Sequence, residues 1–241
     1  MLRLEVRPQP SKAWGYASPL LALLITVLIG VTLFVLLGKD PVRGLQVFFW
    51  EPIKSTYALS ELMVKATPLL IIALGLAVCF RSNVWNIGAE GQYIVGAICA
   101  GGVALTADAT TGSWIVAAVI GAGVLGGMAW AGITALLRDR FNANEILVSL
   151  MLVYVAIQVL NFLVYGPWKD PQGYNFPQTK TFAAAAQMPR LMDGSRVSIG
   201  LPIALLGVVV VSLFLFRTLA GYAQIVGGLA PAAARYAGFS S

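Results

Sequence analysis

The sequence predicts an all-α protein, a polytopic bundle of transmembrane helices with about six spans. Composition is the first reason: 59% of the 241 residues are hydrophobic, 11% are charged, and the mean hydropathy is +0.82. Soluble domains carry about 25% charged residues, so this composition is typical of a protein in a bilayer. The second reason is a series of apolar runs, each close to the length that crosses a membrane.

A membrane-spanning helix needs about 20 consecutive apolar residues, and six segments approach that length. The fourth carries Gly121, Gly123, Gly126 and Gly127. Small residues let transmembrane helices approach closely, so we expect this span inside the bundle. The predicted spans are 19–38, 57–80, 91–107, 113–137, 146–165 and 198–216.

The same runs divide the chain into an N-terminal segment (1–18), a transmembrane domain (19–216) and a C-terminal segment (217–241). Residues 166–197 contain several prolines and no apolar periodicity, which predicts an extracytoplasmic loop. Its length indicates an ordered cap or docking surface, with a flexible loop as the alternative. Two arginines in the short turn 138–145 favour a cytoplasmic N-terminus, which makes both terminal segments cytoplasmic.

Composition also excludes several kinds of site. Histidine is absent, which removes histidine ligands, general bases and proton relays. Cys79 and Cys99 lie in apolar runs without metal-site spacing, so no metal, cofactor or catalytic residue is expected, and a membrane enzyme is disfavoured. The net charge of +6 is spread through the loops, which suits anionic membrane lipid and gives no support to nucleic-acid binding. No P-loop occurs, so any ATP would be bound by another chain.

The segment RSNVWNIGAEGQYIVGA (81–97) places polar side chains between two apolar runs. Asn86 and Glu90 share a face if the segment is helical, and Gly88 and Gly91 allow a break or a close backbone approach. Polar backbone at membrane depth is tolerated only against protein or a water-filled cavity. The segment is therefore either a pore-side element of a transporter or a solvated cytoplasmic loop, and the pattern leaves both open.

Three further patterns have local explanations. Glu61 and Lys65 are four residues apart, which predicts an ion pair at the membrane boundary, either an anchor or a gate. In the turn 138–145, Asn144 is predicted to cap the fifth span, with Glu145 at its positive dipole end and with contact to a cytoplasmic partner as the alternative role of the turn. In the tail, a proline at position 231 and a glycine at position 238 predict a short helix that docks on a partner, with a disordered terminus as the alternative.

Several of these segments occur in the order and spacing of a known family. They are YALSELMVKATPLL, FRSNVWNIGAEGQYIVGA, NANEILVSLMLVYVA, the YGPWKDP loop and PAAARYAG, which together cover most of residues 55–239. In these segments the chain resembles the permease subunits of ABC importers of the ribose/branched-chain amino acid type, nucleoside or simple-sugar branch. WNIGAEGQ and AARYAG are the more specific of the matching motifs.

The resemblance implies a subunit of the cytoplasmic (inner) membrane that has no catalytic residues and moves nucleosides or simple sugars. It implies three partners: ATP-binding subunits, a second and related permease, and an extracytoplasmic solute-binding protein. A short cytoplasmic helix at 230–239 would contact the ATPase. The implied translocation-path residues are Trp85, Asn86, Gly88, Glu90 and Gln92, and the implied coupling residues are Pro231, Ala234, Arg235, Tyr236 and Gly238.

Two departures from the family pattern leave alternatives open. The coupling segment begins Ala230-Pro231-Ala232, where the family usually has Asn-Pro-Glu. Family members also continue with further spans after this helix, so we expect a C-terminally truncated permease. The alternatives are an inactive or scaffold fragment, or a secondary transporter or channel that works without an ATPase.

Overall fold

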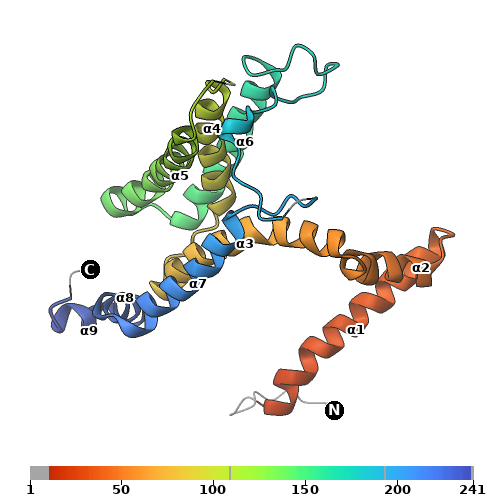
Figure 1. The fold of residues 1–241 in the computed structure, drawn as a ribbon. Coiled ribbons are helices and arrows are strands. Elements are labelled where there is room, and N and C mark those ends of the chain that lie inside the picture. The colour runs from red at the N-terminus through yellow and green to blue at the C-terminus, as the bar shows by residue number, and fades with distance from the viewer. Residues whose placement is uncertain (1–10, 109, 193, 240–241) are drawn as a thin grey trace. The chain divides into compact units, whose positions relative to one another are not determined.

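The structure is a computed structural model that describes residues 11–108, 110–192 and 194–239. Helices dominate the described chain, and the β structure found there consists of isolated bridges in the long loop (Figure 1). The chain divides into two compact units, Met1–Leu62 and Met63–Ser241. Each unit is described by itself.

The first unit is a hairpin of helices. A glycine with positive φ, Gly38, ends its first helix, and the Lys39 N–H donates to the Phe34 carbonyl at 2.9 Å. Asp40 then caps the next helix, which begins with a proline. This Asp-Pro start is a sequence signature of a helix N-terminus that the spans listed above do not include. The elements are α1 (Lys12–Leu36), α2 (Pro41–Leu45), the π-helix η1 (Gln46–Trp50), the 3-10 helix η2 (Glu51–Ile53) and the start of α3 (Thr56–Arg81).

The second unit contains the remainder of α3 and six further α-helices of the described chain. Its first helices are connected by short segments, and the long connection between its third and fourth complete helices holds one 3-10 turn. The elements are α4 (Ala89–Leu105), α5 (Trp114–Phe141), α6 (Glu145–Tyr165), η3 (Ala184–Ala186), α7 (Gly200–Arg217), α8 (Leu219–Leu229) and α9 (Pro231–Tyr236).

Five helices are long and apolar enough to cross a membrane, namely α1, α3, α5, α6 and α7 within the described residues. They correspond to five of the six predicted spans, which confirms a multi-pass membrane protein. The remaining predicted span, 91–107, falls on α4, which has 17 residues. A helix of that length rises about 26 Å, slightly less than the hydrocarbon core of about 30 Å.

Close contacts with α5 and α6 make α4 the best-packed helix of the second unit. A Cβ added at Gly96 would lie 2.9 Å from the Gly123 carbonyl oxygen, and one at Gly126 would lie 2.5 Å from the Cys99 sulfur. The prediction that the glycines of the fourth span bring helices together is thus confirmed at Gly123, Gly126 and Gly127, whereas Gly121 faces open space. α4 therefore packs on α5 and α6 along one side, while Glu90, Tyr93 and Ala97 stay exposed on the other.

The long loop packs on the end of α4 that is remote from its N-terminus. The Trp168 ring lies against Gly101 and Gly102, and the Phe182 ring also reaches Gly101. Ala186 of η3 joins a small buried cluster with Ala104 of α4 and Ile115 of α5. Figure 1 shows the loop beside these helix ends. The loop therefore has packing contacts of its own, in keeping with the expectation of an ordered cap.

Candidate functional site: a polar cavity and the C-terminal helices

The second unit contains a polar cavity of about 550 Å³. It lies where α3 ends, α4 begins, α5 ends and α6 begins, so four segments separated in sequence meet there. One face of α5 supplies side chains at helical spacing. The lining residues are Cys79, Val84, Asn86, Gln92, Ala131, Thr134, Ala135, Arg138, Asp139, Asn142 and Glu145.

An asparagine in the left-handed conformation sets the turn from α3 into this cavity. Asn83 has φ +56°, and its N–H donates to the Phe80 carbonyl at 3.1 Å. The Val84 N–H donates to the Cys79 carbonyl at 3.0 Å, which completes a Schellman-type helix end. Asparagine is one of the few residues other than glycine that adopts this conformation readily. The turn leads into the WNIGAEGQ segment, whose last four residues form the first turn of α4.

Asn86 and Gln92 form a reciprocal amide pair in the cavity wall. The Asn86 Nδ2 donates to the Gln92 Oε1 at 3.2 Å, and the Gln92 Nε2 donates to the Asn86 Oδ1 at 3.3 Å. The same Asn86 oxygen accepts the Gly88 N–H at 2.9 Å. Gln92 still has one unused N–H donor and one unused acceptor lone pair, and Asn86 has one unused N–H donor, because a primary amide offers two N–H donors and two acceptor lone pairs. The pair can therefore bind a further polar group.

Gly88 holds this segment against α6. A Cβ added there would lie 2.7 Å from the Ser149 Cβ and 3.0 Å from the Ser149 carbonyl oxygen. Gly91 has a similar role one turn later, since its added Cβ would lie 3.0 Å from the Val153 Cα. These two approaches fix the N-terminus of α4, and with it the amide pair, beside α6.

Charged residues occupy the side of the cavity where α5 ends and α6 begins. The Arg138 Nη1 lies 3.1 Å from the Glu145 Oε1, an ion pair by distance, although the guanidinium N–H is not aligned for a hydrogen bond. Asn142 ends α5 in the left-handed conformation, with φ +51°. The Asn144 side chain accepts the N–H groups of the first turn of α6, which confirms the predicted cap and is worth about 1 kcal/mol.

A second cavity of about 320 Å³ lies between α3, α4 and α5. It shares Cys79, Asn86, Gln92 and Ala131 with the first, and its other walls are mostly apolar. The amide pair thus lies between the polar cavity at the helix ends and this second, mostly apolar cavity farther along the helices. This position is the one that a polar constriction in a path would occupy.

The other residues implied for the path lie elsewhere. Trp85 is 54% exposed, its ring packs on Phe80 with centroids 5.4 Å apart, and its Nε1 donates to the Asn83 Oδ1. Glu90 lies on the exposed side of the first turn of α4. Of the five implied residues, the structure therefore brings Asn86 and Gln92 into the cavity and uses Gly88 for packing. A path role for Trp85 and Glu90 stays a prediction.

Glu61 and Lys65 both belong to α3, one turn apart as the spacing predicts. Because they are four residues apart, the helix places both side chains on the same face. The intramembrane ion pair between them stays a prediction.

The C-terminal segment contains two helices where the sequence predicts one. α8 precedes the predicted short helix, which appears as α9, beginning at Pro231 and ending before Gly238. Gly238 has φ +81°, its N–H donates to the Arg235 carbonyl, and the Phe239 N–H donates to the Ala234 carbonyl, both at 3.0 Å. This is a Schellman motif, so the predicted start and stop signals are confirmed.

The implied coupling residues divide by exposure. Pro231, Arg235 and Gly238 are exposed, and the Tyr236 side chain is 97% exposed. The Ala234 side chain is 1% exposed, at the fold of α9 against α8. Four of the five implied coupling residues are therefore exposed to a partner. Ala234, the fifth, packs where α9 contacts α8.

α8 is attached to the end of α3 that forms the cavity. The Gln224 Nε2 donates to the Ser82 hydroxyl and, at 3.5 Å, to the Val78 carbonyl. A Cβ added at Gly228 would lie 2.6 Å from the Arg81 carbonyl oxygen, so the two backbones are in close contact. The C-terminal helices and the polar cavity consequently share the α3–α4 turn.

Sequence reasoning assigned the charged turn 138–145 a capping role and did not place it in the site. The structure adds Arg138, Asp139, Asn142 and Glu145 to the cavity wall. The available signal was the concentration of charge between two apolar runs. Only the tertiary structure shows that this charged turn lines the same cavity as the α3–α4 turn.

The comparisons with known proteins agree with this architecture. The family described as "Branched-chain amino acid transport system / permease component" matches residues 58–241. The chain is 33% identical to a glucose ABC transporter permease protein of Haloferax volcanii, over 99% of this chain and 66% of that protein. It is 27% identical to a nucleoside ABC transporter permease protein of Lactococcus lactis, over 92% and 63% of the two chains.

A third relative is a guanosine ABC transporter permease protein of Bacillus subtilis, 26% identical over 92% of this chain and 64% of that protein. The chain thus spans about two thirds of the length of the curated relatives it matches. No solved structure matches.

Proposed function

Because the chain belongs to the family of branched-chain amino acid transport system permease components, we propose that it is the membrane-spanning subunit of an ATP-driven importer for nucleosides or simple sugars. The observation that carries the proposal is the Asn86–Gln92 amide pair between two adjoining cavities of a membrane helix bundle. Polar groups in such a position are typical of a solute path, because they are costly anywhere else in a membrane.

The amide pair also supports the substrate class. Relatives are named for glucose, nucleoside and guanosine transport, and these solutes have in common several sugar hydroxyl groups. A hydroxyl both donates and accepts hydrogen bonds, as does a primary amide. Asn86 and Gln92 would exchange their mutual hydrogen bonds for bonds to the hydroxyl groups of a passing solute. Such an exchange keeps the amides satisfied throughout transport.

The C-terminal helices support coupling to ATP hydrolysis. α9 presents Pro231, Arg235 and Tyr236 at its surface, and α8 connects it to the α3–α4 turn that carries Asn86. Closure of two ATP-binding subunits would move α9 and α8, and the turn would shift the amide pair between two arrangements. The partners are then the ATP-binding subunits, a second permease and an extracytoplasmic solute-binding protein, in a cytoplasmic membrane with the N-terminus inside.

The test is uptake by proteoliposomes that contain this chain within its complete transporter. We expect ATP-dependent accumulation of labelled nucleoside or glucose, and no accumulation when the ATP-binding subunits are omitted. Arg235→Ala should reduce uptake about tenfold or more while ATP hydrolysis continues, whereas Lys180→Ala in the long loop should leave coupling unchanged. Equal uptake with and without the ATP-binding subunits would instead identify a channel or secondary transporter.

A further inference from the structure

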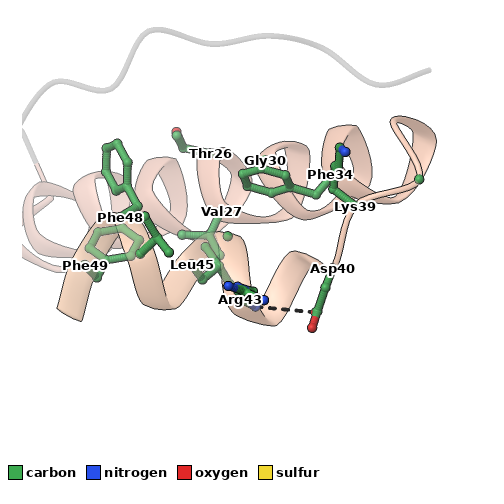
Figure 2. Close-up of a pocket in the computed structure, with 13 residues that line it drawn as sticks. Thr26, Val27, Gly30, Phe34, Lys39, Asp40, Arg43, Leu45, Phe48 and Phe49 are labelled. Atoms are coloured by element: carbon green, nitrogen blue, oxygen red, sulfur yellow. Dashed lines mark hydrogen bonds between the residues drawn. The ribbon is translucent and has the colours of Figure 1, made fainter. Parts of the chain in front are cut away.

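The first unit contains a groove that the proposed transport function does not use. It lies between α1 and the α2–η1 segment and has a volume of about 920 Å³ (Figure 2). Its walls include Val27, Gly30 and Phe34 of α1, with Leu45, Phe48 and Phe49 opposite. The Thr26 hydroxyl, also on the wall, donates to the Ala22 carbonyl within α1 at 2.8 Å. The stretch of the groove between these side chains is therefore apolar.

The length of the groove matches one leaflet of a bilayer. Its lining on α1 runs from Thr26 to Phe34, which corresponds to about 12 Å of helix at 1.5 Å per residue, and Gly38 continues the wall beyond the end of the helix. Half of the hydrocarbon core is about 15 Å thick. Since α1 is one of the candidate membrane spans, a groove along it lies at the depth of acyl chains.

Charge is concentrated at one end of the groove. Figure 2 shows Lys39 and Asp40 at the end where α1 turns into α2 and Arg43 between Asp40 and Leu45, with the Phe48 and Phe49 rings farther along the groove. The Asp40 carboxylate accepts the Val42 N–H at 2.9 Å and the Arg43 N–H at 3.4 Å, so it is engaged in capping α2. The Lys39 ammonium and the Arg43 guanidinium exceed it by one positive charge. The groove is thus apolar along its length and cationic at its interfacial end.

We propose that this groove binds one anionic phospholipid, with an acyl chain along Phe34 and Phe48 and the phosphate at Lys39 and Arg43. The groove is complementary to an anionic phospholipid, because it is apolar along the acyl-chain region and cationic where the phosphate would lie. Arginine binds phosphate through two parallel N–H donors, and lysine acts as a point charge beside it. A lipid in this position would fill the space between the two arms of the hairpin.

A protein segment fits the same features less well. A transmembrane helix has a diameter of about 10 Å with its side chains, and the two arms of this hairpin are already in contact through Gly44 and the Phe34 ring. A flexible acyl chain adapts to such a narrow space. The positive end would also require a partner helix to carry an acidic group at the membrane surface, whereas every anionic phospholipid carries one.

The experiment measures phospholipid retained by the intact chain in its transporter. The protein is equilibrated in vesicles of mixed phosphatidylcholine and phosphatidylglycerol, extracted in a mild detergent and examined by native mass spectrometry. We expect a retained phosphatidylglycerol in preference to phosphatidylcholine. Lys39→Gln with Arg43→Gln should lower its retention about 25-fold, because each cation near a membrane surface contributes about fivefold.

Gly30→Phe tests the apolar part independently of charge. A Cβ at Gly30 meets nothing within 4 Å, so the ring can enter the groove without displacing its walls and should exclude the acyl chain. Gly15→Phe is the matched control on α1, since a Cβ there also meets open space and Gly15 lies outside the groove lining. Lys180→Gln is the charge control in the long loop.

Loss of retention in the groove variants, with both controls unchanged, supports the site. Equal retention of the two lipids, or unchanged phosphatidylglycerol in the double charge variant and in Gly30→Phe, overturns it. Loss of the second permease from the transporter in Gly30→Phe, with phosphatidylglycerol still bound, also overturns it and makes the groove a protein contact.

Discussion

At the scale of single residues, the absence of a side chain at Gly88 allows the polar segment to contact α6. The Ser149 Cβ and carbonyl oxygen occupy the space that a Gly88 side chain would need. Because these atoms belong to a helix or lie next to its backbone, they cannot move aside without shifting α6. The position of the neighbouring amide pair depends on this contact.

Gly88→Ala should therefore destabilise the protein. Overpacking of this kind costs about 1–3 kcal/mol, and we expect a lower thermal unfolding midpoint of the purified permease. Gly75→Ala in α3 is the matched control, since a Cβ there meets nothing within 4 Å and alanine favours a helix. An unchanged midpoint for Gly88→Ala would show that α6 can shift freely.

A second residue-scale prediction concerns the amide pair itself. Gln92→Leu removes both side-chain hydrogen bonds that join Gln92 to Asn86 and leaves a polar group partly unpaired in the cavity. Because Asn86 is half-buried, its lost hydrogen bonds cost about 1 kcal/mol, and we expect uptake by the complete transporter to fall about fivefold.

The control is Gln158→Leu, which removes an amide from an exposed position on α6 and should leave uptake close to the original rate. Uptake that is equally reduced by both substitutions would show a general effect on the bundle. Unchanged uptake in Gln92→Leu would remove the amide pair from the path.

At the scale of elements, α8 connects the C-terminal helix to the turn between α3 and α4. Its N-cap, Thr218, accepts the Gly221 N–H at 3.0 Å, and Gly221 packs on the backbone of α7 at Leu215. Gln224 reaches the end of α3 from the middle of the same helix. We propose that an outward displacement of α9 is transmitted to α3 through this helix.

Gln224→Leu should weaken that transmission. We expect ATP hydrolysis by the complete transporter to continue while solute uptake falls several-fold, because the hydrogen bond to Ser82 is lost. Ser82→Ala should have the same effect, and the double variant should be no worse than either single one, as expected for two groups of one interaction. Additive losses in the double variant would contradict this link.

At the scale of the whole molecule, the two ends of the second unit have different chemistry. One end holds the charged cavity and the C-terminal helices, and the other holds the long loop on α4 and α5. We propose that the first end faces the cytoplasm, as the arginines of the turn 138–145 indicate. The long loop then faces the solute-binding protein.

Single cysteines test this orientation in a background with Cys79 and Cys99 replaced by alanine. Tyr174→Cys lies at a loop position that is 95% exposed and should react with an impermeant maleimide added to intact cells. Arg140→Cys, exposed at the end of α5, should react only after the membrane is opened. The reverse pattern would place the N-terminus outside.

The sequence predicted much of the fold because apolar run length and helix-end signals are local properties. Asn144, Pro231 and Gly238 end or begin helices as predicted, since each acts on its own backbone neighbours. Boundaries were less well predicted: α1 begins at Lys12 and continues through Pro19, where the apolar run starts. A helix continues past the end of its apolar face as long as its backbone hydrogen bonds are satisfied.

By itself the sequence determined the all-α class, five of the predicted spans, the helix-end signals and, through its motifs, the permease family. Only the tertiary structure decided that Asn86 and Gln92 face one cavity with Arg138 and Glu145, that Trp85 and Glu90 lie outside it, and that α8 is attached to α3. The physical reason is the separation along the chain over which each kind of interaction acts. Helix formation depends on neighbours within a few residues, whereas a cavity depends on which distant segments pack together, as glycine contacts such as that between Gly88 and Ser149 decide.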